Sequence, residues 1–277
     1  SSGPTKQKAA RLVVDLASTA GASEFIRADN AHVSGVSVIT GGHGLRRFLS
    51  DLSGDPDGKV SIPTTLNSAG CDNEKIGEMG IDYPDFLEQQ FEIVHSYSEL
   101  GIEATLSCTP YDRGLKYPGG IGSWAESNAV CFSNSYTSLM TNRESGLSAL
   151  ATALTGWAPK WGLHLEHNRR PNILVNIECE MSDTSDWSVL GDWIGKQISP
   201  TWDLPWGPMP RIVGLPSASF EMRKALTASA ANYGCPMLWA DGVTGDAPEV
   251  ESYEGEIKFT ESDLRKRYAE LAPRAGV

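Results

Sequence analysis

Apolar residues along this chain recur at two spacings, which predict helices alternating with strands. Recurrence every three to four residues predicts helices over 6–19, 45–52, 84–100, 146–154, 187–198, 219–233 and 260–271. Runs of apolar and β-branched residues predict a strand or strand–loop over 31–40 and strands over 59–66, 102–107, 172–181, 211–215 and 236–240. Because helical crossovers connect parallel strands, this order predicts a layered α/β fold with largely parallel sheets.

The helix over 84–100 has the clearest apolar stripe. Leu87, Phe91 and Val94 share one helical face, so we expect that face to pack against the core. The glycine-rich stretch 41–44 predicts a flexible turn, because glycine favours conformations that interrupt helices and strands. The stretch 41–44 lies between the first two predicted strands, and the helix over 84–100 follows them.

Small polar residues follow three of the predicted strands. Ligands of α/β proteins bind at the carboxyl ends of parallel strands, so this coincidence predicts a lined pocket. Each group also has a structural interpretation: a histidine with satisfied hydrogen bonds, turn hydrogen bonds, or a buried thiol. The three groups are His32, Ser34 and Gly35, then Thr64, Thr65, Asn67 and Cys71, and then Cys108, Thr109 and Tyr111.

The stretch from Thr105 to Glu144 is dense in polar residues that a core does not need. Arg143 offers a fork of donors that matches a carboxylate or phosphate, or it is a surface residue paired with Glu144 or Glu126. Glu126 is a candidate general acid or base. By spacing alone it is better explained as the partner of Ser123 in a capping box, which predicts a helix from there to about residue 132.

Composition excludes several classes of partner. The 23 Lys and Arg residues against 35 Asp and Glu residues give a net charge of −12, without a basic cluster, so nucleic acid and anionic membrane surfaces are not expected partners. No apolar run is long enough to span a bilayer. The five scattered cysteines lack Cys-x-x-Cys spacing and predict reduced thiols in a cytoplasmic protein. A further candidate metal cluster is formed by His164, Glu166 and His167. As candidate metal ligands these residues rank below the cysteines.

Seven motifs, in order along the chain, resemble the aconitase X family of dehydratases. They are Ala-His-Val-Ser-Gly-Val-Ser (31–37), Pro-Thr-Thr-Leu-Asn-x-Ala-Gly (63–70), Ser-Cys-Thr-Pro-Tyr (107–111), Trp-Ala-Glu-Ser-x-Ala-Val (124–130), Thr-Asn-Arg-Glu (141–144), Leu-Thr-Gly (154–156) and Gly-Leu-His-Leu (162–165). The resemblance implies an aconitase-like α/β fold, an iron–sulfur cluster or iron, and a hydro-lyase that removes water from a hydroxylated carboxylate.

The resemblance also implies roles for individual residues. Cys108 is the best iron ligand and Cys71 a weaker one. Ser34 and Glu126 are the catalytic candidates, although the general base is not fixed by the sequence. The expected substrate-binding residues are His32, Thr65, Asn67, Ser127, Asn128, Asn142 and Arg143. Because a cluster takes three or four cysteine ligands, we expect the remaining ligands to come from outside this chain.

The family carries further α/β sequence and a small swivelling domain, so we expect a second polypeptide that completes the site. Residues 1–240 are expected to form an incomplete catalytic region, and 241–277 an acidic linker with a final helix. The lack of a basic cluster favours cis-3-hydroxy-L-proline as substrate over the alternative, mevalonate 5-phosphate. A non-catalytic assembly subunit is a rival interpretation, and a thiol-nucleophile enzyme using Cys108 is the least favoured.

Overall fold

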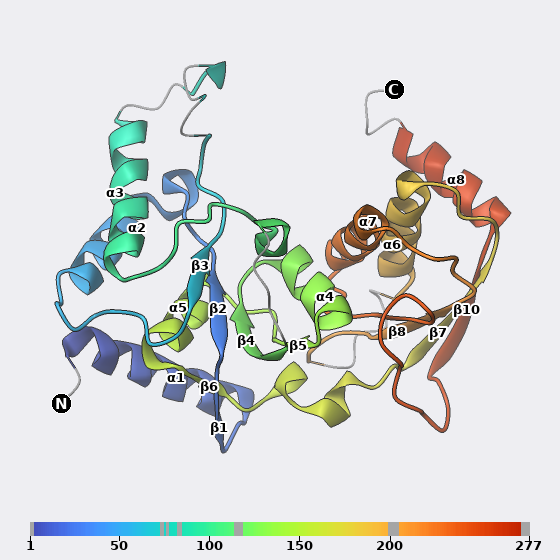
Figure 1. Ribbon diagram of the computed structural model, residues 1–277, viewed down its shortest axis with the longest axis horizontal. Coiled ribbons are helices and arrows are strands. Elements are labelled where there is room, and N and C mark those ends of the chain that lie inside the picture. Colours follow the sequence, from blue (N-terminus) through green and yellow to red (C-terminus); the bar gives the residue numbers. More distant parts are fainter. Residues whose placement is uncertain are drawn as a thin grey trace. The chain divides into compact units, whose positions relative to one another are not determined.

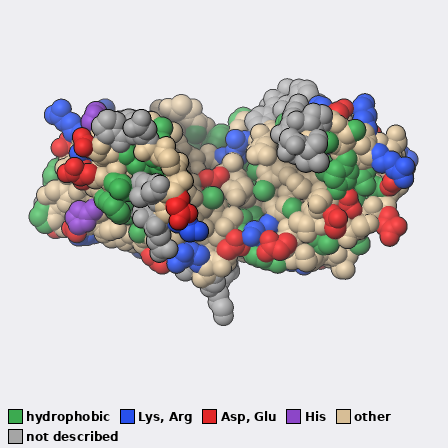
Figure 2. Space-filling view, turned by 90° about the horizontal axis from the view of Figure 1, so that it is seen from above, with side chains coloured by type: hydrophobic (Ala, Val, Ile, Leu, Met, Phe, Trp, Pro, Cys, Tyr) green, Lys and Arg blue, Asp and Glu red, His purple; other side chains and the backbone are tan. Residues whose placement is uncertain are grey.

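The computed structural model describes residues 3–72, 75, 78–81, 85–113, 119–198 and 205–272. The chain forms two compact units, each with its own parallel sheet. Unit 1 comprises residues 1–126 and 143–161, and unit 2 comprises residues 127–142 and 162–277. Acidic and basic side chains are interspersed on the face drawn in Figure 2. None of the helices in the described ranges is long and apolar enough to cross a membrane.

Unit 1 consists of α1 (Pro4–Ala20), β1 (Phe25–Arg27), β2 (Asn30–Val33), α2 (Val38–Ser53), β3 (Thr64–Leu66), α3 (Phe86–Glu99), β4 (Gly120–Trp124), α5 (Gly146–Thr155) and β6 (Trp157–Pro159). Its central strands run parallel in the order β3-β2-β4 (Figure 1). Val33 and Leu66 lie opposite each other on β2 and β3, and both pack with Leu150 of α5 in the main core. The short β1 and β6 pair antiparallel.

Unit 2 consists of α4 (Ser127–Tyr136), β5 (Leu139–Met140), β7 (Ile173–Glu178), α6 (Thr184–Ile198), β8 (Pro210–Val213), α7 (Phe220–Ala231), β9 (Trp239–Ala240), β10 (Gly255–Thr260) and α8 (Glu261–Leu271). Its sheet is parallel in the order β10-β7-β8-β9. In Figure 1 the helices α6, α7 and α8 lie on one side of these strands. Trp187, Val175 and Phe259 are fully buried in the core between them.

These elements confirm the expected α/β class with parallel sheets. The helices predicted near 6–19, 146–154 and 187–198 correspond to α1, α5 and α6. Two left-handed glycines end helices: Gly21 (φ 69°) follows α1 and Gly156 (φ 77°) follows α5. The strands β1, β4, β5 and β6 were not expected, and neither was β10, whose residues lie in the stretch that the acidic composition marked as a linker. The boundary expected at residue 240 stays a prediction.

The expected apolar stripe of α3 is wrong for two of its three residues, since only Val94 packs against the core. Leu87 and Phe91 are 37% and 49% exposed, whereas Phe86, Ile93 and Tyr97 face the core. Gln90 shares that buried face and is 1% exposed. The apolar pattern pointed to the wrong side because this buried face includes a polar residue whose hydrogen bonds are satisfied inside the protein.

Other local predictions also differ from the structure. Of the strand or strand–loop expected over 31–40, the strand ends at Val33, residues 34–37 form a loop, and α2 begins at Val38. The glycines of 41–44 lie within α2 and form no separate turn, although the helix is broken at Gly42 (φ 55°). The expected capping box is not formed, because Ser123 is a buried residue of β4 and α4 begins only at Ser127. Of the strand expected over 102–107, only a single bridge between Glu103 and Thr65 is present.

Candidate functional site

The parallel strands of unit 1 end at one edge and bring the predicted polar groups together there. His32 on β2 lies opposite Thr65 on β3 and Trp124 on β4. Isolated bridges extend this row to Glu103 beyond Thr65 and to Arg143 beyond Trp124. The segments that leave these strands therefore start side by side at the carboxyl edge, where α/β proteins bind ligands.

His32 is the most deeply buried polar residue of this edge. Its side chain is fully buried, and Nδ1 lies 2.8 Å from the Thr65 hydroxyl. Burial lowers the pKa of the imidazole to about 4, so the ring is neutral at pH 7. Nε2 is buried without a hydrogen-bond partner among the described residues. A neutral ring of this kind offers one more hydrogen bond to a bound polar group, and it supplies no charge.

Asn67 and Glu126 connect the segments that follow β3 and β4. The Asn67 amide donates from Nδ2 to Glu126 Oε2 over 2.7 Å. Asn67 itself is held by its backbone N–H, which donates to the Val33 carbonyl over 2.8 Å, and its Oδ1 accepts from the Ser68 N–H. Glu126 is thus a half-buried carboxylate with a fixed orientation at the edge. Its hydrogen bond goes to Asn67, which replaces the capping role expected from its spacing to Ser123.

Cys108 lies on the segment next to β3. Its thiol is exposed, and Sγ lies 3.4 Å from the Ser68 hydroxyl. The Ser107 N–H donates to the Leu66 carbonyl and the Thr109 N–H donates to Ser107 Oγ, which fixes the turn that presents the thiol. Leu106 just before it adopts a left-handed backbone (φ 47°), which costs a non-glycine residue roughly 1–2 kcal/mol. Such strain is common at ligand-binding sites.

An open pocket of about 700 Å³ adjoins this turn and is lined by residues 68–72, 79, 104–106 and 113. We call it the Cys71 pocket. Burial, with a smaller contribution from Asp72, raises the pKa of the Cys71 thiol, which disfavours the thiolate that a metal would bind. Arg113 lines the same pocket at the end of a short 3-10 helix, Pro110–Arg113, and its exposed guanidinium makes no hydrogen bond or ion pair to the described residues.

Ser34 and Arg143 flank this edge. Ser34 is half-buried, and its carbonyl lies so close to Gly146 that a Cβ there would approach it to 2.3 Å, which fixes the start of α5 against the segment after β2. Arg143 is exposed beside Trp124, and the following Glu144 N–H donates to the Trp124 carbonyl over 3.0 Å. The Arg143 backbone therefore lies at the end of the same row of strands as His32.

The remaining predicted residues belong to unit 2. Ser127 and Asn128 start α4, and Asn128 Oδ1 is buried without a hydrogen-bond partner in the described part of the chain. Asn142 is buried, and its Oδ1 accepts from the Leu163 N–H over 2.7 Å, while Nδ2 lies 3.3 Å from His164 Nδ1. Asn142 thus connects β5 to the turn at 162–164. This arrangement gives it a structural role in addition to any role in binding.

The structure also tests whether the cysteines fit an iron–sulfur cluster. Within the described ranges, no three His, Cys, Asp or Glu side chains are grouped closely enough to hold a metal ion, and this includes His164, Glu166 and His167. Cys108 is the exposed thiol of the candidate site and fits the role of one ligand. The other ligands of a cluster would have to come from outside the described residues.

Sequence reasoning missed Ser68 and Arg113. Ser68 directly follows Asn67, and its hydroxyl is the contact of the Cys108 thiol. Arg113 lies two residues after the Ser-Cys-Thr-Pro-Tyr motif, and the sequence analysis considered only Arg143 as the anion-binding arginine. In both cases a position next to a recognised motif was the available signal, and the pocket geometry was needed to interpret it.

Comparisons with known proteins cover most of the chain. The family model described as "Aconitase X first domain" matches residues 1–167, and the one described as "Aconitase X second domain" matches residues 171–269. A crystal structure of aconitase X from Thermococcus kodakaraensis in its holo-form superposes with a TM-score of 0.84 at 32% identity, over 96% of this chain and 65% of that chain. This likeness confirms the aconitase-like fold expected from the sequence.

Two curated relatives carry different names. The phosphomevalonate dehydratase large subunit of Methanothermobacter thermautotrophicus is 37% identical over 260 residues, covering 93% of this chain and 63% of that protein. The cis-3-hydroxy-L-proline dehydratase of Pseudomonas aeruginosa is 33% identical over 261 residues, covering 91% of this chain and 43% of that protein. The chain thus spans less than two thirds of the length of these relatives.

Proposed function

The chain belongs to the aconitase X family, and from this premise we propose that it forms the larger part of a dehydratase acting on mevalonate 5-phosphate. The reaction removes a proton from the carbon next to the carboxylate and the hydroxyl from the carbon after it. The hydroxyl leaves as water, and a double bond forms between the two carbons. The observation that carries this proposal is the carboxyl edge of the unit 1 sheet, where His32, Asn67, Cys108 and Glu126 meet.

The choice of substrate departs from the preference drawn from composition. Composition favoured hydroxyproline because no basic cluster is present in the sequence. The relatives named as phosphomevalonate dehydratase large subunits reach the higher identity, 37% against 33%, and support the alternative better. Arg113 adds a physical reason, since its fork of donors in the Cys71 pocket suits a phosphate without any cluster of lysines.

In this proposal the residues at the edge divide the work. Glu126, held by Asn67, is the general base that takes the proton next to the substrate carboxylate. The exposed Arg143 binds that carboxylate and stabilises the charge that develops on it. The neutral, buried His32 ring contacts the Thr65 hydroxyl and so holds β3 beside β2 at the end that faces the substrate. Cys108 would bind an iron centre, which would act as a Lewis acid on the departing hydroxyl.

In this proposal, the complete enzyme includes sequence beyond this chain. The relatives named as large subunits are longer than the matched region, and their name implies a smaller partner in those proteins. We place the missing cluster ligands and the small swivelling domain in that additional sequence or in a second polypeptide. The cytoplasmic location expected from the reduced thiols is part of the same proposal.

The test compares two substrates on the complete protein reconstituted with its partner. We expect turnover of mevalonate 5-phosphate, measured as the double-bond product, to exceed that of cis-3-hydroxy-L-proline by at least about tenfold in kcat/KM. Cys108→Ala should lower both iron content and activity, whereas Cys179→Ala, a half-buried cysteine in unit 2, should change neither. An assembly that turns over neither substrate would favour the non-catalytic subunit, and full iron in the Cys108 variant would refute the ligand assignment.

A further inference from the structure

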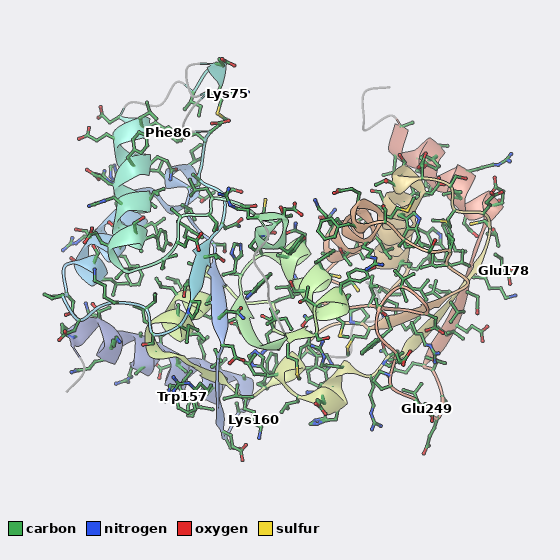
Figure 3. All side chains as sticks on the ribbon, in the orientation of Figure 1. Lys75, Phe86, Trp157, Lys160, Glu178 and Glu249 are labelled. Atoms are coloured by element: carbon green, nitrogen blue, oxygen red, sulfur yellow. The ribbon has the colours of Figure 1, made fainter. Side chains whose placement is uncertain are left out.

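The buried residues of α3 include Gln90 and Tyr97, whose polar side chains are 1% and 2% exposed. They lie two helical turns apart on the side that begins with Phe86, labelled in Figure 3 at the start of α3. A buried polar side chain is costly unless its hydrogen bonds are made, so its partners indicate why the position is polar. All the partners of these two side chains are backbone groups of loops at the candidate site.

Gln90 binds two different loops at once. Its Oε1 accepts from the Val38 N–H over 3.1 Å and from the Gly70 N–H over 3.2 Å. Its Nε2 donates to the Val36 carbonyl over 2.8 Å. Val36 and Val38 belong to the segment that leaves β2, and Gly70 belongs to the segment that leaves β3. The side-chain amide therefore fills its main hydrogen-bonding positions by joining two neighbouring strand exits.

These two loops carry residues of the candidate site. Ser34 precedes the first bound segment by two residues, and Asn67 and Ser68 precede Gly70 on the second. The contact at Gly70 is so close that a Cβ there would lie 2.7 Å from Gln90 Oε1, so a larger residue at this position would displace the amide. Tyr97 supports the first loop further on, where its hydroxyl donates to the Gly35 carbonyl over 3.3 Å.

We propose that Gln90 is a positioning residue, which fixes the distance between the loop carrying Ser34 and the loop carrying Asn67 and Ser68. It lies outside the site and acts through backbone groups only. The consequence rests on the proposed function: the Asn67 amide orients the Glu126 carboxylate, and Ser68 contacts the Cys108 thiol, so a shift of the second loop displaces the base and the thiol together. Displacements of about 1 Å can lower catalytic rates roughly 100-fold.

The first test replaces Gln90 with methionine, which fills the same volume without the hydrogen bonds. In the complete assembly, Gln90→Met should lower kcat by about 10- to 100-fold per folded molecule, with a smaller change in KM. Gln89→Met is the matched control, because Gln89 is its buried neighbour and its Oε1 makes no hydrogen bond within the described ranges. That variant should leave kcat and KM unchanged.

Hydrogen exchange gives a readout that does not depend on turnover. In Gln90→Met the amides of Val38 and Gly70 lose their acceptor, so exchange should accelerate at these two segments and not across the rest of unit 1. A uniform acceleration with unchanged kcat would show that Gln90 only stabilises the fold, and would overturn the proposal. If the wild-type assembly turns over neither substrate, the proposed function fails. Unchanged exchange at the Val38 and Gly70 amides of Gln90→Met would refute the positioning role, whatever the turnover.

Gln90→Glu gives a second signature. A protonated carboxyl can donate to the Val36 carbonyl and accept from the Val38 and Gly70 amides, whereas the ionised form faces the Val36 carbonyl oxygen without a proton to donate. The activity of this variant relative to wild type should therefore fall as the pH rises. A pH-independent ratio would contradict the geometry, since a general loss of stability would not follow the titration of this one carboxyl.

Discussion

The sheets of the two units use the polar residues at their strand ends differently. In unit 2, Thr260 at the end of β10 and Asp263 form a capping box that starts α8, and Asp241 after β9 pairs with Arg211 at 2.9 Å. In unit 1, the corresponding residues contact one another across neighbouring strands, as His32 does with Thr65. Both sheets are parallel, so topology alone does not decide where chemistry occurs.

The difference lies in the hydrogen-bonding capacity that remains. A residue in a helix cap or an ion pair has its main partners within the protein and stabilises the fold. At the edge of unit 1, His32 Nε2 is unpartnered within the described ranges, the Cys108 thiol is exposed, and Glu126 is oriented by a single amide. We therefore expect substitutions at the edge of unit 1 to change activity and those at the strand ends of unit 2 to change stability.

The largest expected effect is loss of activity in Glu126→Gln. The glutamine oxygen can still accept from Asn67 Nδ2, so the local geometry is kept while the basic carboxylate is removed. If Glu126 is the general base, kcat should fall by about 10²- to 10⁴-fold. The measurement is steady-state turnover of mevalonate 5-phosphate by the complete assembly.

The matched control is Asp241→Asn in unit 2, which also neutralises a carboxylate that follows a strand. It weakens a half-exposed ion pair with Arg211, so it should alter stability by no more than about 1 kcal/mol and leave kcat within twofold. A similar loss of activity in both variants would remove the distinction between the two sheet edges.

The second effect concerns the buried imidazole of His32 and pH. Its pKa is about 4 in the folded protein because of burial, against an ordinary value of 6.5 in the unfolded chain. Between these values the unfolded state binds the additional proton, so the free energy of unfolding falls as the pH falls. The contribution is fully present above pH 6.5 and is lost by pH 4, with a total of about 3 kcal/mol. Denaturant unfolding between pH 7 and 4 measures it.

His32→Gln should flatten this dependence, because the replacement does not titrate. His95→Gln is the control, since the His95 side chain is 74% exposed on α3, and its pH dependence should match that of the wild type. If His32→Gln and the wild type lose stability in parallel between pH 7 and 4, His32 is not a buried neutral ring.

The comparison between units also shows which features could be predicted from sequence. Helices with a clear periodicity were predicted well, such as α1, α6 and α8. The convergence of His32, Asn67 and Cys108 at one edge could be expected because parallel strands share a carboxyl end. These features depend on local patterns or on one general rule of topology.

Other features depended on contacts between residues far apart in the sequence. Gln90 made the buried face of α3 appear polar, and only its bonds to the loops after β2 and β3 explain its burial. Glu126 had the spacing of a capping box with Ser123, yet its partner is Asn67, 59 residues away. Spacing within a motif carries no information about such partners, so the sequence favoured the local explanation.

The smallest expected effect is loss of one helix cap in unit 2. In Thr260→Ala the hydroxyl that accepts from the Asp263 N–H is removed, which should lower the free energy of unfolding by about 1 kcal/mol. Because this strand end serves only α8, kcat per folded molecule should stay at the wild-type value. Thr260→Ser keeps the hydroxyl and should recover most of the stability. Loss of turnover in the alanine variant at a temperature where it remains folded would show that the strand ends of unit 2 also serve the reaction.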